Sequence, residues 1–227
     1  MIDIVILIMM LFFVIIGYKK GLIKELITLA GSIMALLMAF VIYPAINSIL
    51  KVTALYTIIY TGVFEKVQNI NFGKGLQSQG NAIIENITWL PKVLTEQIRD
   101  NNNSAMYEVL GVHTLHEYIS TYITNMIISM LAILITWFLI KIVLIGALKK
   151  LGNIVEHLPV ISQFNQLGGG IVGAIKGLLT LSIIMLIIPI IVANPNLSDI
   201  GMKLEASYFV QWIYKHNLVI WLYNYYL

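Results

Sequence analysis

The chain has 227 residues, of which 59% are hydrophobic and 11% charged, and its mean hydropathy is +0.88. A soluble domain carries about 25% charged residues, so this composition excludes a water-exposed surface over most of the chain. The net charge of +3 comes from dispersed lysines and excludes a nucleic-acid-binding surface, and the absence of cysteine excludes disulfides and thiolate metal sites. We therefore predict one polytopic membrane domain with a smaller solvated part.

The first apolar segment, residues 2–16, is followed by the basic turn Gly17-Tyr18-Lys19-Lys20-Gly21. The segment reaches roughly 22 Å as a helix, which is less than the ~30 Å hydrocarbon core of a bilayer. Lysines at a helix end can extend to the headgroups, so the segment either spans or pairs with the next helix as a tight hairpin. Its start is not basic and no small-residue cleavage site follows it, so we expect a retained segment and not a cleaved signal peptide.

The second apolar segment, residues 26–43, has the length of a span, and Pro44 with Asn47 and Ser48 marks its exit. Small residues recur in it close to every fourth position: Ala30, Gly31, Ala35 and Ala39. Such spacing lets helix backbones approach closely in lipid. The next apolar piece, residues 52–64, has only 13 residues, so we expect a buried or interfacial helix there.

The middle of the chain, residues 65–117, is polar, and its six acids outnumber its four bases. Residues 71–80 are turn-like and hold three glycines. Apolar residues then recur at helical spacing on both sides of Pro91, until the run Asp100-Asn101-Asn102-Asn103-Ser104 breaks the pattern. We expect short amphipathic helices on the membrane or on the bundle, and no independent domain.

Two further spans follow, at residues 119–148 and 167–193, with an amphipathic linker over residues 152–166. The tail, residues 196–227, ends in a belt of Tyr and Trp side chains, which favour the membrane interface. We expect the tail to form an interfacial helix and not a fifth span. The predicted segments are a first transmembrane hairpin with an interfacial helix (1–64), a polar extracytoplasmic loop (65–118), a second hairpin with a cytoplasmic linker (119–193) and the aromatic tail (194–227).

The lysines of the short loops predict the orientation of these spans. Lys19, Lys20 and Lys24 follow the first span, and Lys149 and Lys150 follow the third. Short loops rich in lysine stay on the cytoplasmic side. We therefore predict that the N- and C-termini and the polar loop lie outside.

Glycines are candidates for helix packing. Gly169, Gly173 and Gly177 lie four residues apart and share one helix face, which is typical of a packing surface for another helix. Gly168-x-Gly170-x-x-Gly173 formally matches a dinucleotide-binding motif, but that motif needs a preceding strand, whereas an apolar 20-mer follows here. Further glycines expected to pack are Gly17, Gly21 and Gly31.

Lys176 is an ionisable residue about 13 Å along the fourth predicted span. A charge at that depth is a functional-site hypothesis, because an unpaired charge in lipid is costly. In one interpretation it lines a cavity that attracts anions, with Lys141 or Glu156 as neighbours. In the favoured one its ammonium extends to the cytoplasmic headgroups.

The sequence predicts no catalytic residue, cofactor site or metal site. His113, His116 and Glu117 fall near one helix face, but their spacing is not a known metal motif and no second ligand cluster supports it, which favours a solvated polar face. No Walker motif, nucleophile elbow or carboxylate pair is present. We therefore do not expect an enzyme.

Two sequence blocks carry a resemblance. The first is residues 3–7 with Gly17-Tyr18-Lys19-Lys20-Gly21-Leu22-Ile23-Lys24-Glu25-Leu26, and the second is Asn165-Gln166-Leu167 with Gly169-Gly170-Ile171-Val172-Gly173-Ala174-Ile175-Lys176-Gly177. They resemble the opening and closing signatures of the colicin V production protein (CvpA) family. The resemblance covers the four spans. The middle of the chain is longer than the family pattern and the tail after Ala193 departs from it, so nothing is carried onto either.

The resemblance implies a multi-pass protein of the bacterial inner (cytoplasmic) membrane, linked by the family name to bacteriocin and toxin production or export. Two functional hypotheses follow. The first is a non-enzymatic scaffold or accessory factor, acting through envelope or secretion partners that bind the polar loop. The second is a homo-oligomeric channel or transporter, with the face of Gly169, Gly173 and Gly177 at its axis and Lys176 tuning anion passage. Apart from such proteins, the lipid bilayer is the expected partner.

Overall fold

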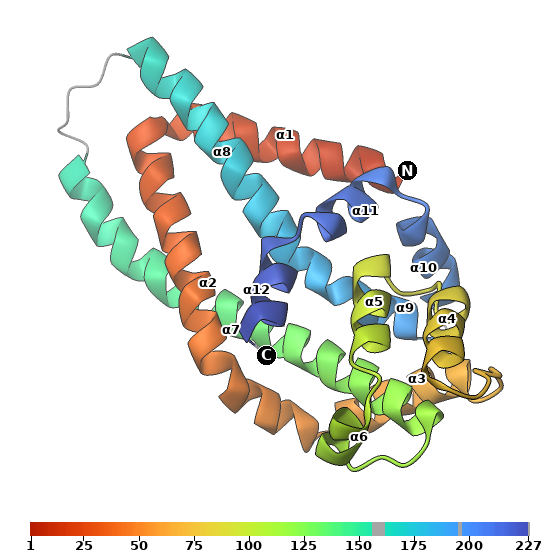
Figure 1. The fold of residues 1–227 in the computed structure, drawn as a ribbon. Coiled ribbons are helices and arrows are strands. Elements are labelled where there is room, and N and C mark those ends of the chain that lie inside the picture. The colour runs from red at the N-terminus through yellow and green to blue at the C-terminus, as the bar shows by residue number, and fades with distance from the viewer. Residues whose placement is uncertain (156–161, 195–196, 227) are drawn as a thin grey trace. The chain divides into compact units, whose positions relative to one another are not determined.

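The structure is a computed structural model, and it describes residues 1–155, 162–194 and 197–226. Every regular element in those residues is a helix (Figure 1). The elements are α1 (Ile2–Lys20), α2 (Leu22–Lys51), α3 (Ala54–Val67), α4 (Leu76–Asn86), α5 (Lys92–Asp100), α6 (Ser104–Leu110), α7 (Leu115–Val155), α8 (Ser162–Ile184), the 3-10 turn η1 (Met185–Ile187), α9 (Ile188–Ala193), α10 (Ser198–Glu205), α11 (Tyr208–Lys215) and α12 (Leu218–Tyr226).

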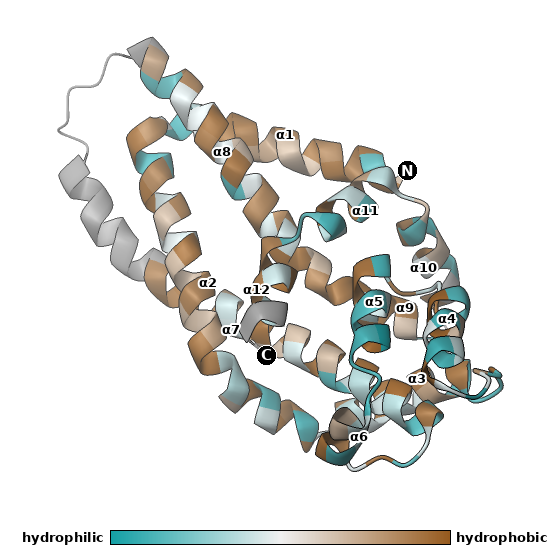
Figure 2. Ribbon diagram, in the orientation of Figure 1, coloured by the Kyte–Doolittle hydropathy of each residue, from teal (hydrophilic) through white to brown (hydrophobic). Residues whose placement is uncertain are grey.

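Four stretches in this part of the chain are long and apolar enough to cross a membrane. They are α1, α2, the first 30 residues of α7 (Leu115–Leu144) and the stretch Phe164–Ala193. Figure 2 shows apolar residues along α1, α2 and α8, whereas hydrophilic residues gather on α4 and α5. The structure thus confirms the predicted all-α membrane fold with four spans and additional short helices.

The chain folds into two compact units, each built from segments that are distant in sequence. The first unit comprises Met1–Ile46, Ala132–Met185 and Asn217–Leu227, and the second comprises Asn47–Leu131 and Leu186–His216. Helix α7 therefore begins in the second unit and continues into the first. These units are not the four consecutive segments expected from the sequence. One helix, α7, contributes its first part to one unit and its later part to the other.

In the first unit, α1 lies along α8 (Figure 1), and most of the small residues of α2 are buried, whereas Ala30 is exposed. Ala35 and Ala39 are fully buried. The indole Nε1 of Trp137, on α7, donates a hydrogen bond of 3.4 Å to the carbonyl oxygen of Ser32 on α2. Small residues on α2 thus allow a large aromatic side chain of α7 to reach the α2 backbone.

In the second unit, the polar segments are fixed by buried aliphatic residues and a few polar anchors. Ile83, Leu94 and Ile98, on α4 and α5, are fully buried. The hydroxyl of Tyr118, on α7, donates a hydrogen bond of 2.7 Å to the carbonyl oxygen of Ile98. Burial of one face of each short helix explains why the expected amphipathic pattern folds here.

Two of the spans differ from the sequence prediction. Helix α2 does not end at Pro44 but continues to Lys51. The fourth span is not one continuous helix, because Pro189 has no backbone N–H and cannot bond to Met185, where the chain tightens into η1.

The tail forms three short helices where one was expected. The side chain of Ser207 accepts a hydrogen bond of 3.3 Å from the Val210 N–H and thereby caps α11. The side chain of Asn217 accepts one of 2.9 Å from the Val219 N–H at the start of α12. Each capping residue begins a new helix and so divides the tail.

Candidate functional site

The crossing of α1 and α8 places glycine against glycine. A Cβ atom added at Gly17 would lie 2.9 Å from the Cα of Gly173 and would collide with the Gly169 carbonyl oxygen. A Cβ at Gly169 would lie 2.7 Å from the carbonyl carbon of Gly21. The two backbones are therefore in direct contact, and side chains at these positions would force the helices apart. The glycine face of α8 is filled by α1 of the same chain.

The turn between α1 and α2 depends on a residue of α8. Gly21 has φ 82°, a conformation that favours glycine, and its N–H donates to the Gly17 carbonyl at 2.9 Å. The side-chain Oδ1 of Asn165 accepts a hydrogen bond of 2.8 Å from the backbone N–H of Leu22, the first residue of α2. Asn165 thus caps α2 from a position distant in sequence, and it satisfies a backbone donor that would otherwise be unpaired at the helix start.

A buried group of charged residues lies one turn further along α2. The Glu25 carboxylate is completely buried, and the ammonium of Lys176, on α8, donates a hydrogen bond to its Oε1. Oε2 of Glu25 lies 3.7 Å from the Lys20 ammonium and accepts a hydrogen bond of 3.1 Å from the Thr28 hydroxyl. The same hydroxyl oxygen lies 3.5 Å from the Lys176 Nζ. Both oxygens of the carboxylate therefore have cationic partners.

Lys176 is 7% exposed, and its ammonium is held by Glu25 between the helices. The favoured expectation, an ammonium that extends to the headgroups, is therefore wrong for this structure, because a buried carboxylate within reach stabilises the charge where it is. Lys141, the first of the two expected neighbours, places its ammonium 4.2 Å from the centroid of the Trp137 ring instead. Glu156, the second, lies outside the described residues.

The other predicted residues are placed as follows. Gly177 contacts Phe13, since an added Cβ would lie 3.0 Å from the Phe13 Cβ, and Gly31 is buried in α2. Lys19 and Lys24 are exposed at the turn between α1 and α2. Lys149 and Lys150 belong to α7, but their side chains lie outside the described residues.

The residues considered for metal binding have local structural roles. Oε2 of Glu117 accepts hydrogen bonds of 2.9 and 3.2 Å from the N–H groups of His113 and Thr114, while its own N–H donates to the Thr114 hydroxyl. This is a capping box at the start of α7. Among the residues that the structure describes, no group of three or more His, Asp or Glu side chains could hold a metal ion.

No role for Glu25, Thr28 or Asn165 is predicted from the sequence. A signal for the first two was present, because Glu25, Thr28 and Ser32 recur at spacings of three and four residues on an otherwise apolar helix. This spacing predicts one polar face. Asn165 had no such signal, since its partner is a backbone N–H that is 143 residues away in sequence.

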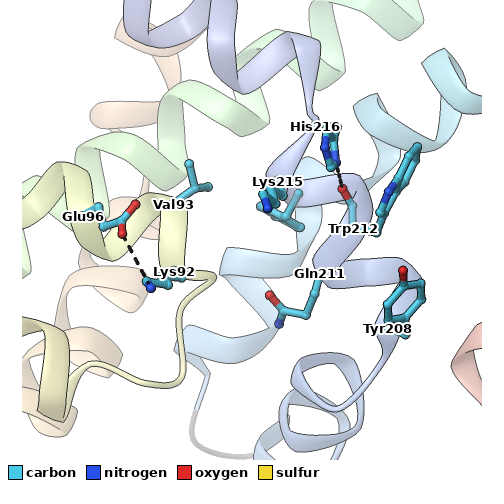
Figure 3. Close-up of a pocket in the computed structure, with 9 residues that line it drawn as sticks. Lys92, Val93, Glu96, Tyr208, Gln211, Trp212, Lys215 and His216 are labelled. Carbon is cyan, nitrogen blue, oxygen red and sulfur yellow. Dashed lines mark hydrogen bonds and ion pairs between the residues drawn. The ribbon is translucent and has the colours of Figure 1, made fainter.

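The second unit carries a groove of about 660 Å³ between α5 and α11 (Figure 3). Lys92 of α5 lies 3.9 Å from Glu96 on the same helix. Residues of α11 and its C-terminal end also line the groove: Tyr208, Gln211, Trp212, Tyr214, Lys215 and His216. The groove combines two ammonium groups with one carboxylate and an exposed Trp212 ring.

Comparison with known proteins gives one result. The family model described as colicin V production protein matches residues 2–69 and 104–217. The matched ranges hold both sequence blocks that meet at the crossing, and they extend past Ala193 into α10 and α11. The intervening residues 70–103, which include α4 and α5, are not matched. No curated protein and no solved structure matches this chain.

Proposed function

This chain belongs to the colicin V production protein family, and from that membership we propose that it acts in bacteriocin production, secretion or related envelope processes. We infer a non-enzymatic scaffold or accessory factor of the bacterial inner membrane. It assembles partner proteins and catalyses no reaction.

The observation that carries the proposal is the internal use of α8. Its glycine face is filled by α1, and its buried Lys176 is neutralised by Glu25. A channel built on that face would need the glycines at an open axis and the lysine available to passing anions. In this chain α1 covers the glycines and Glu25 pairs with the lysine, so neither requirement is met, which supports a packed scaffold over an oligomeric pore.

We propose that the partner binds the groove between α5 and α11 through an acidic, extended segment. Lys92 and Lys215 line this groove, and Glu96 is its one carboxylate among the lining residues. Opposite charge on the partner would steer its approach and fix its register. Helix α5 lies in the stretch that the family model does not match, which supports a partner particular to this chain.

The test is release of bacteriocin by cells that lack their own family member and carry this chain instead. The proposal expects Lys92→Glu and Lys215→Glu to lower release, whereas Lys203→Glu, an exposed lysine of α10, leaves it unchanged. Deletion of residues 74–104 would not test the groove specifically, because it also removes Ile83, Leu94 and Ile98, which are buried in the second unit. Liposomes that contain the purified protein are expected to stay impermeable to ions with and without membrane tension. Ion flux through folded protein would instead support the channel hypothesis.

We further propose that both termini lie outside and that the turn with Lys19, Lys20 and Lys24 lies in the cytoplasm. The chain has no cysteine, so a single introduced cysteine is the only thiol of the protein, and its labelling shows on which side of the membrane it lies. Ser78→Cys is expected to react with an impermeant maleimide in intact cells, and Lys19→Cys only after the membrane is opened. The reverse pattern would invert the orientation.

A further inference from the structure

Lys141 is a cation in a membrane span without a carboxylate partner among the described residues. It is half-buried in α7, and its ammonium lies 4.2 Å from the centroid of the Trp137 ring. A ring face attracts a cation but does not neutralise it. Charged residues inside spans are costly and are normally paired, so Lys141 stands out from Lys176, which has Glu25.

The packing of α7 on α2 places Lys141 near the basic turn. The Trp137 indole bonds to the Ser32 carbonyl, and the two helices run in opposite directions (Figure 1). Four residues along α7 bring Lys141 roughly 6 Å nearer to the turn, and four residues back along α2 bring Thr28 to the same level. Lys141 and Thr28 are therefore at about the same depth.

Among the described residues, Glu25 is the carboxylate partner of both Lys20 and Lys176, whereas Lys141 has none. Lys20 is the last residue of α1, beside Glu25 at the α1–α2 turn, and the register of α7 on α2 places Lys141 towards the same turn. Glu25 pairs with Lys176 and lies 3.7 Å from Lys20, so it offsets one of the three positive charges. The two positive charges that remain are those of Lys20, which is 45% exposed, and of the half-buried Lys141, and together they would attract an anion.

The surroundings of Lys141 indicate which anion. Side chains of α7 beside it are apolar and exposed: Phe138, Leu139, Ile142 and Val143. Such a surface suits an acyl chain, and basic sites between spans bind acidic lipid headgroups. We propose that Lys141, supported by the Trp137 ring, and Lys20 bind the phosphate of an anionic phospholipid at the membrane face that carries the α1–α2 turn.

Retention of lipid by the full chain tests this site. The protein is reconstituted into nanodiscs that contain equal amounts of phosphatidylglycerol and phosphatidylcholine. The lipids that stay bound when the protein is released from the nanodiscs are counted by native mass spectrometry. Wild type is expected to retain phosphatidylglycerol preferentially. Lys141→Gln and Lys20→Gln are each expected to lower that preference roughly fivefold, Lys141→Arg to keep it, and Lys51→Gln, at the other end of α2, to leave it unchanged.

Three results would overturn the proposal. Wild type could retain both lipids equally, or Lys51→Gln could lower the preference as much as Lys141→Gln. Inorganic phosphate at millimolar concentration could displace phosphatidylglycerol, which would make the site one for the free anion. Far-UV circular dichroism confirms the fold of each variant, and Lys20→Gln, at a side chain that is 45% exposed, provides the measurement if Lys141→Gln does not fold.

Discussion

Replacing Glu25 with Gln should destabilise the protein strongly. The substitution preserves the size of the side chain but removes its charge, so the Lys176 ammonium is left in a site that is 7% exposed. Removing one partner of a buried ion pair costs about 3–5 kcal/mol, because the remaining charge is uncompensated. We expect about 3 kcal/mol, the lower end, since the Gln amide oxygen can still accept hydrogen bonds from Lys176 and Thr28.

A second substitution separates the charge from the packing. Lys176→Met removes the uncompensated ammonium, and the double variant Glu25→Gln/Lys176→Met should recover most of the stability lost in Glu25→Gln. For residues in direct contact we expect a coupling free energy of about 2–3 kcal/mol. Lys20→Gln is the matched control. Its side chain is 45% exposed, so loss of its contact with Glu25 should cost less than about 1 kcal/mol.

The assay is equilibrium unfolding in mixed detergent micelles, followed by far-UV circular dichroism. The free energy of unfolding is measured for the wild type, both single variants, the double variant and the control. If Glu25→Gln unfolds within about 0.5 kcal/mol of wild type, the pair contributes no more than an ordinary surface contact. If the double variant equals the sum of the singles, the two charges are not coupled.

Further outcomes follow from the other contacts. Gly173→Leu should disrupt the α1–α8 crossing, seen as loss of a disulfide between cysteines engineered outside the glycines on the two helices, whereas Ala174→Leu on the same helix should keep that disulfide. Asn165→Ala should lower the free energy of unfolding by about 1 kcal/mol, the usual loss for a helix cap, and Asn165→Asp should restore it. Burial lowers the pKa of Lys66, on α3, and Glu205 opposes that shift. The folded state thus penalises its charged form below the folded pKa, so stability should rise as pH approaches 10.5, the ordinary pKa, and this rise should shrink in Lys66→Met. An equal rise in Lys66→Met would assign the effect to other groups.

The sequence allowed prediction of the class and the spans, because length and hydropathy are properties of single segments. It also predicted that Gly169, Gly173 and Gly177 form a packing face. It could not identify α1 as the element that fills this face, since helical periodicity defines a face without naming its partner. Glu25 and Lys176 are 151 residues apart in sequence, and only the tertiary fold brings them together. Pro189, Ser207 and Asn217 were visible signals for the break in the last span and for the division of the tail.

The hydrogen bond from Leu22 to Asn165 has a consequence for biogenesis. The acceptor is synthesised 143 residues after the donor, which at about 5–20 residues per second amounts to roughly 7–30 s of translation. During that interval the first two helices are in the bilayer without the cap of α2 and without the glycine face that α1 contacts. A chain whose synthesis stops before Asn165 therefore lacks both the cap of α2 and the glycine face of α8. Final assembly of the amino-terminal hairpin is thus timed by the emergence of the last span.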